Sequence, residues 1–248
     1  MSQLSRKFCL ITPGVTPVYD QMGRMPLVAV MLAAGWSTAS AQDTAFASPY
    51  DSPYGPSHTF AAFRNGERIG THMLSFKREG SQLVVSTTVD LAVKMLGFTA
   101  YRYSHRGKEV WNGNTLLAVE TSTNDDGKQY VVRAVRQGED LVVDSHTPET
   151  GGYRRTTVAG VLPSTHWNLK QTAQSQLLNS QKGTVDPVRV TTIGRESVAT
   201  ASGTIQATHY RYEGKDGFAM DQWFDARGRW VKTTFAAHDG SLIEYVLQ

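Results

Sequence analysis

The feature that most constrains this chain is a long succession of short alternating runs, each ended by a turn that contains glycine. From His58 onward such turns recur, among them Asn65-Gly66, Asn112-Gly113, Asp126-Gly127 and Asp239-Gly240. Asn-Gly and Asp-Gly favour the two-residue turns whose twist suits β-hairpins. The pattern therefore predicts an antiparallel meander of hairpins.

The clearest alternation lies between residues 83 and 95. One face carries Leu83, Val85, Thr87, Val89, Leu91, Val93 and Met95. The residues between them are mostly polar or small, and a period of two is typical of a half-buried strand. The same criterion predicts strands at approximately 58–64, 67–78, 82–95, 98–111, 115–123, 129–137, 140–146, 187–199, 203–213, 218–225, 229–237 and 241–247.

One segment, Ser164–Ser180, breaks the strand pattern and follows Pro163. It is rich in Gln, Leu and Ala, and it has helical spacing at Leu169, Ala173, Gln176 and Leu177. We predict a helix, or a helix and a loop, in this segment. A meander must also protect its two edge strands by curling or closing. The predicted fold is therefore mainly β: an antiparallel meander forming a strongly curved sheet or barrel with one inserted helix.

The N-terminal region differs in character from the rest. An apolar run, Met25–Gly35, follows Arg24 and precedes the small-residue motif Ala39-Ser40-Ala41. This layout is typical of a secretory signal, and the run is too short to span a bilayer. We predict a signal peptide at 1–41, with Met22 as an alternative start, then a flexible proline-rich tether at 42–57 and a single β-domain at 58–248. The mature protein is expected to be periplasmic or secreted, without a transmembrane segment.

Charge and cysteine content narrow the function classes. The chain has 25 basic and 22 acidic residues. Three of the basic residues and one of the acidic residues lie in the predicted signal. The mature chain is thus close to neutral, which gives no support for nucleic-acid binding. The single cysteine, Cys9, also lies in the signal. The mature domain therefore has no disulfide and no thiol chemistry.

Several runs together resemble a known family. They are 65–72 (NGERIGTH), 94–103 (KMLGFTAYRY), 109–111 (EVW), 162–168 (LPSTHWN) and 225–231 (DARGRWV). The set is similar to a domain-of-unknown-function family of exported proteobacterial β-proteins, and the resemblance spans most of 58–248. It implies a secreted β-domain and supplies no catalytic residues. The architecture is also similar to the periplasmic lipoprotein-carrier half-barrels, at the level of the fold alone.

Motifs for cofactor chemistry are missing. None of the histidines, His58, His72, His105, His146, His166, His209 and His238, has a partner at metal-binding spacing. Neither the G-x-S-x-G turn of many hydrolases nor a phosphate-binding loop occurs. We therefore expect no metal and no cofactor.

The leading hypothesis is a non-catalytic envelope protein, or one that binds a hydrophobic ligand such as an apolar small molecule or lipid in a cavity beside the sheet. The ligand-cavity candidates are Leu83, Val85, Val89, Leu91, Val93, Met95, His166, Trp167 and Leu177. Trp167 either plugs the end of the sheet or borders a pocket, and plugging is favoured. One alternative is a periplasmic hydrolase, its catalytic residues unknown but sought among His105, His166, His209, Asp221 and Asp225. Another is a structural interaction module that pairs through an exposed strand edge.

Overall fold

The computed structural model describes residues 52–95 and 97–248. The predicted signal peptide and most of the predicted tether lie outside these residues. Tyr54, near the end of that tether, is buried and stacks on Phe76, with ring centroids 4.7 Å apart. Its hydroxyl donates to the carbonyl of Trp167 and accepts the backbone N–H of Trp230 at 2.8 Å. Tyr54, within the predicted tether, is therefore held against both the sheet and the insert.

The twelve predicted strands are all present, with ends within two residues of those expected. The first half contains β1 (Ser57–Arg64), β2 (Glu67–Glu79), β3 (Gln82–Met95), β4 (Phe98–Asn112), β5 (Thr115–Asp125), β6 (Lys128–Gln137), β7 (Asp140–His146) and β8 (Tyr153–Ala159). The second half contains β12 (Arg189–Thr200), β13 (Gly203–Glu213), β14 (Ala219–Asp225), β15 (Trp230–Ala236) and β16 (Leu242–Leu247). The exposed strand β8 was not predicted.

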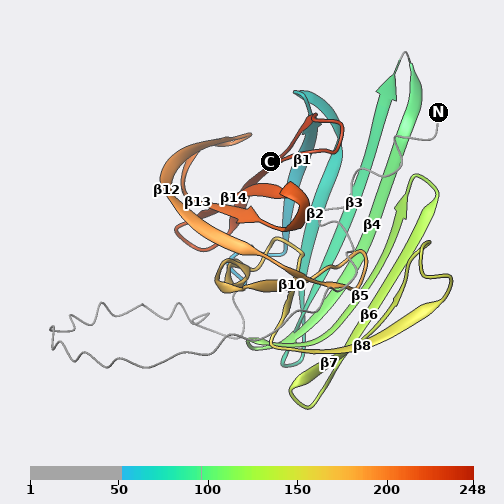
Figure 1. Cartoon of the computed structure of the whole chain (residues 1–248). Coiled ribbons are helices and arrows are strands. Elements are labelled where there is room, and N and C mark those ends of the chain that lie inside the picture. Colours follow the sequence, from blue (N-terminus) through green and yellow to red (C-terminus); the bar gives the residue numbers. More distant parts are fainter. Residues whose placement is uncertain (1–51, 96) are drawn as a thin grey trace, which may run out of the picture.

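These thirteen strands form one antiparallel sheet in the order β12-β13-β14-β15-β16-β1-β2-β3-β4-β5-β6-β7-β8. Consecutive strands pair as hairpins, and β16 pairs with β1, for example Tyr245 with Ala62. The last strand of the chain therefore joins the first within the sheet, and β8 and β12 are the two edge strands, which do not pair with each other. It curves strongly but stays open in the part of the chain described, so the curved-sheet prediction is confirmed and closure into a barrel is not (Figure 1).

The segment between those two edge strands, residues 160–188, forms what we call the insert. It contains β9 (Leu162–Pro163), the 3₁₀ turn η2 (Leu169–Ala173), β10 (Gln176–Leu178) and β11 (Val185–Pro187). Its three short strands form a separate sheet in the order β11-β10-β9. The predicted helix at Ser164–Ser180 was wrong, because within the described residues the helical elements are only η2 and the single turn η3 (Lys215–Gly217).

Local hydrogen bonding explains why this helix does not form. The Asn168 side chain accepts from the N–H of Lys170 at 3.0 Å, and the Asn179 side chain accepts from the N–H of Gln181 at 3.0 Å. Such side-chain bonds offer the backbone an alternative to a helical ladder. His166 also adopts φ +70°, a left-handed conformation that a helix excludes. Leu177 instead lies in β10, paired on both sides.

The insert packs inside the curve of the sheet and touches both of its halves. Trp167 lies edge-on to Phe76 of β2 and Trp111 of β4, at centroid distances of 5.6 Å for each pair. On the other half, the His166 ring lies 5.5 Å from that of Trp230 on β15. The insert therefore fills the space that a closed barrel would enclose, and its contacts hold the two halves around one core.

Candidate functional site

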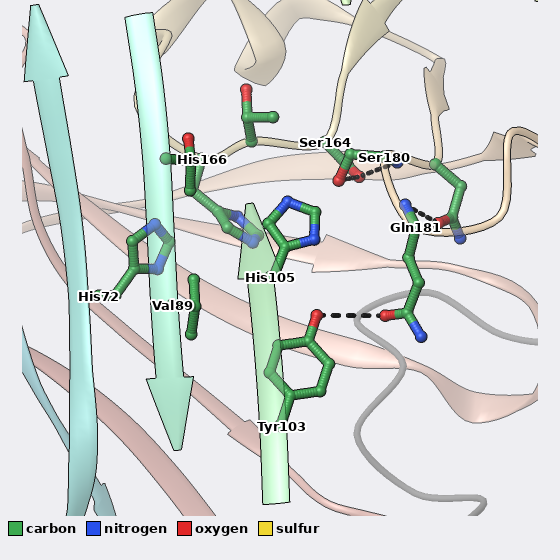
Figure 2. Close-up of a pocket in the computed structure, with 11 residues that line it drawn as sticks. His72, Val89, Tyr103, His105, Ser164, His166, Ser180 and Gln181 are labelled. Atoms are coloured by element: carbon green, nitrogen blue, oxygen red, sulfur yellow. Dashed lines mark hydrogen bonds between the residues drawn. The ribbon is translucent and has the colours of Figure 1, made fainter. Parts of the chain in front are cut away.

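A small cavity lies between the insert and the strands β2, β3 and β4. Its volume is about 20 Å³. It is lined by His72, Thr87, Val89, Tyr103, His105, Ser164, Thr165, His166, Asn179, Ser180 and Gln181. The volume matches about one water molecule and is far below the several hundred Å³ of a site for a drug-sized ligand. Figure 2 shows the rings of His72, His105 and His166 around a common space.

Strand register explains how two of these histidines meet. His72 on β2 pairs with Val89 on β3, and Val89 pairs with His105 on β4. The three residues thus form a row across neighbouring strands, with their side chains on one face of the sheet. His166 reaches the same space from the insert. Residues more than thirty positions apart in the sequence are thereby brought together by the meander.

The three histidines have few hydrogen-bond partners. Nδ1 of His105 lies 2.7 Å from the Thr123 hydroxyl, and Nδ1 of His166 lies 3.0 Å from the Gln222 side-chain nitrogen. Both ring nitrogens of His72 and Nε2 of His166 are buried without a partner. Burial lowers the pKa of His105 and of His166 to about 4, and it lowers the pKa of His72 well below 6.5. All three rings are therefore neutral at pH 7.

Hydroxyl and amide groups close the other side of the cavity. The Tyr103 hydroxyl donates to Oε1 of Gln181 at 3.2 Å, and the Ser164 and Ser180 hydroxyls are 3.3 Å apart (Figure 2). Nε2 of Gln181 has no partner. No carboxylate lines the cavity. Among the described residues, no group of three or more His, Cys, Asp or Glu is arranged to hold a metal ion.

A buried carboxyl group, Glu109 on β4, anchors the insert. Trp111 donates its indole N–H to Oε2 at 2.9 Å, and Trp167 of the insert donates to Oε1 at 2.8 Å. Burial raises the pKa of Glu109 to about 7, although the indole hydrogen bonds oppose that rise. Glu109 thus ties the insert to the sheet through a group whose charge depends on pH near neutrality.

The structure distributes the ligand-cavity candidates over different environments. Val89 and His166 line the cavity. Val85, Leu91, Val93, Trp167 and Leu177 are buried in the hydrophobic core, and Leu83 is partly buried against it. Met95 is 55% exposed. Trp167 packs edge-on against Tyr54, Phe76 and Trp111.

The residues considered for a hydrolase do not form a single site. His209 lies 2.7 Å from Asp221 and 3.0 Å from Glu196, and Asp221 also pairs with Arg211 at 2.8 Å. Asp225 instead pairs with Arg229 at 2.7 Å in the β14–β15 turn. None of these groups lines the cavity that contains His105 and His166.

Sequence reasoning missed several cavity residues: His72, Tyr103, Ser164, Ser180 and Gln181. Tyr101, Tyr103 and His105 alternate along β4 and are all buried. His72 could have been found only with the strand register. The three insert residues could not have been placed, because the predicted helix would have directed their side chains elsewhere.

These observations define a class: a strongly curved, open antiparallel sheet whose hollow is filled by an insert from its own chain. The chain belongs to the family described as a domain of unknown function (DUF6134), whose model matches residues 60–248. This confirms the resemblance seen in the sequence. No curated protein matches the chain.

Two solved structures are similar in fold. One is the β-barrel-like protein of the domain of unknown function DUF1849 from Brucella abortus, with TM-score 0.57 and 10% identity, covering 77% of this chain and 94% of that chain. The other is a protein from Parabacteroides distasonis, provisionally described as a lipoprotein, with TM-score 0.30 and 7% identity, covering 77% and 92%. The first likeness supports the fold alone. In the part of the chain that the structure describes, no helix is long and apolar enough to cross a membrane.

Proposed function

We propose that this chain is an exported, non-catalytic protein of the bacterial cell envelope that acts through its outer surface. The observation that carries this proposal is the position of the insert inside the curve of the sheet, where the cavity between it and β2, β3 and β4 measures only about 20 Å³. A substrate or lipid would have to displace the insert to enter. Export is inferred from the secretory signal in the sequence.

The pairing of the candidate catalytic groups supports the same view. The His209 ring stacks on Trp223 at 4.4 Å between centroids, and it is held between Asp221 and Glu196. His105 and His166 are buried among polar side chains without a carboxylate to orient them. A general base needs both reach to a substrate and an orienting partner, and neither set offers both.

Titration with an apolar fluorescent probe tests this proposal. The full chain is expected to show no saturable internal binding, because the insert occupies the hollow of the sheet and the cavity beside it measures only about 20 Å³. A control removes the plug: Trp167→Ala opens space between β2 and β4 and is expected to create binding if the variant folds. Saturable binding by the parent, competed by a fatty acid, would overturn the proposal.

A carrier function is the second candidate, and a specific observation favours it. The insert is unusually polar for a plug. Three of its side-chain nitrogens are buried without a hydrogen-bond partner: the Nε2 atoms of His166, Gln171 and Gln181. Each such atom costs about 1–3 kcal/mol, which lowers the free energy needed to displace the insert. On this view the insert is a movable cover, and the parent would bind the apolar probe in the titration described above.

A further inference from the structure

The hairpin formed by β3 and β4 projects beyond its neighbours. β2 pairs with β3 only as far as Gly70–Leu91, and β5 pairs with β4 only as far as Tyr103–Asp125. Asp126 still donates its backbone N–H to the Arg102 carbonyl at 2.8 Å, and beyond Arg102 β3 and β4 pair only with each other, through to Met95–Phe98. Because Val93 and Tyr101 are buried, the free part of the hairpin begins after that pair, and two residues at about 3.3 Å each carry Met95 ~7 Å past it. Figure 1 shows this hairpin extending beyond the rest of the fold.

The tip of this hairpin carries large exposed apolar side chains. Phe98 is 78% exposed and Met95 is 55% exposed. Met95 belongs to the alternating row that is buried from Val85 to Val93, but the register shifts between Val93 and Lys94, and no neighbouring strand covers it. The folded domain does not use either side chain in its core, and two such groups together at one projecting point are unusual on a solvated surface.

The charges beside the tip are positive. Between Leu91 and Ser104 the hairpin contains Lys94 and Arg102 and no acidic residue. Among the described residues neither cation forms an ion pair. The acids that contact this part of the hairpin lie at its base: Asp125 is buried against Tyr101, and the Asp126 side chain accepts from the backbone N–H of Arg102 at 3.4 Å.

We propose that this tip inserts into the surface of an anionic lipid bilayer, with Phe98 and Met95 among the acyl chains and Lys94 and Arg102 at the headgroups. Apolar side chains flanked by cations on a narrow projection fit such an interface, where apolar groups enter about 5–10 Å. The pairing of Met95 with Phe98 satisfies part of the backbone at the tip, as a lipid environment requires. The proposal rests on the proposed envelope function and names its partner.

Vesicle co-sedimentation with the full chain tests the proposal. We expect binding to vesicles of equal phosphatidylcholine and phosphatidylglycerol, and much weaker binding to phosphatidylcholine alone. Met95→Ser with Phe98→Ser should lower the affinity at least roughly tenfold. Lys94→Gln with Arg102→Gln should lower it by about thirtyfold on anionic vesicles only, because each of the two cations near the surface contributes about 1 kcal/mol.

A matched control replaces two apolar side chains of similar exposure elsewhere on the sheet. Val135→Thr with Ile193→Thr should leave vesicle binding unchanged, since these side chains, 53% and 54% exposed, lie on β6 and β12. All variants change exposed positions and should melt as the parent does. A second readout places an environment-sensitive dye at Met95→Cys in a Cys9→Ser background, and its emission should shift to the blue only with anionic vesicles.

Each outcome decides one proposal. Lipid insertion would be overturned if the parent did not bind anionic vesicles, or if the Met95→Ser, Phe98→Ser variant bound them as well as the parent does. It would also be overturned if the tip captured an envelope protein while the chain bound no vesicles. The proposed function has its own failure, saturable internal binding of the apolar probe. Failed vesicle binding with no internal probe site would therefore leave the proposed function standing and remove only its lipid partner.

Discussion

Glu109 is the residue whose chemistry most directly links the insert to the sheet. Its carboxyl group is buried and accepts two indole hydrogen bonds, one from each side of the contact. Among residues 52–95 and 97–248, no cation forms an ion pair with it. Burial raises its pKa to about 7, from a usual value of 4.5. Since the folded state holds the proton more tightly than the unfolded chain, the associated stability is present below pH 4.5 and is lost as the pH rises toward about 7.

Glu109→Gln tests this assignment. The variant keeps the shape of the side chain but cannot ionise, so its stability relative to the parent should improve as the pH rises from about 4.5 to about 7. The change over this range should be about 3 kcal/mol, because each pKa unit corresponds to about 1.4 kcal/mol. Urea unfolding at a series of pH values measures it. Glu67→Gln on the surface is the control, and a pH-independent difference for Glu109→Gln would refute the assignment.

The buried histidines act in the opposite direction. Their pKa values are lowered in the folded state, to about 4 for His105 and His166, so their stability is present above pH 6.5 and is lost as the pH falls toward about 4. The combined effect of three such histidines on the pH dependence of stability should exceed the opposite effect of the single Glu109. We therefore expect the domain as a whole to lose stability on acidification below pH 6.5.

His72→Leu isolates one of these groups. Neither nitrogen of His72 has a partner, and its ring lies 5.0 Å from that of Trp230 and 5.4 Å from that of Tyr245. An apolar side chain of similar volume should stabilise the domain by about 1 kcal/mol at neutral pH. It should also reduce the loss of stability between pH 7 and pH 5, since one proton fewer is taken up on unfolding. A destabilised variant with the parent's pH dependence would contradict the view that His72 is a neutral ring buried without a partner.

At the scale of elements, the central question is whether the insert is a plug or a cover. Its strand β10 is paired on both sides, and Leu177 on that strand is buried in the core. The carbonyl of Ser180 accepts the Thr121 hydroxyl of β5, and Gln222 of β14 contacts His166. Contacts to both halves of the sheet indicate that the insert and the sheet unfold together.

Leu177→Asp separates the two possibilities. A plug should unfold with this substitution, because burying an unpaired charge costs several kcal/mol. A cover would swing away, leave the sheet folded and admit an apolar probe. Gln176→Asp, at the exposed neighbouring position of the same strand, is the matched control and should melt as the parent does. Thermal melting together with probe binding measures the outcome, and a folded, probe-binding Leu177→Asp would show that the insert is a cover.

The success of strand prediction and the failure of helix prediction have one physical cause. Period-two alternation and Asn-Gly or Asp-Gly turns are local signals, and β1 to β7 and β12 to β16 depend on them. The insert depends on long-range contacts, such as that between Trp167 and Glu109, which lie 58 positions apart. The spacing of Leu169, Ala173 and Leu177 resembled a helix, but tertiary packing and the Asn168 and Asn179 side chains overrode it.

The candidate cavity was only partly predictable for the same reason. Val89 and His105 could be placed on the inner face of their strands from alternation alone. Their neighbour His72 depends on the register between β2 and β3, which is set by the turn between Glu79 and Gln82 at the far end of the hairpin. His166 was proposed from its position after Pro163, and its neighbours Ser180 and Gln181 required the true path of the insert.

At the scale of the whole molecule, an open sheet of thirteen strands avoids closure by placing its own insert between the two edges. The edges β8 and β12 flank the insert in sequence, and β12 is exposed along most of its length. On the proposed function, the insert stabilises the interior, and the outer surface and the projecting β3–β4 hairpin carry the activity. We propose that the hollow of the sheet holds the chain's own residues in place of a ligand.

Native mass spectrometry of the protein purified from a bacterial periplasm tests this claim most directly. We expect a single species with the mass of the polypeptide alone, without a bound small molecule or metal. Species heavier by the mass of a lipid or fatty acid, retained in stoichiometric amount through purification, would contradict it.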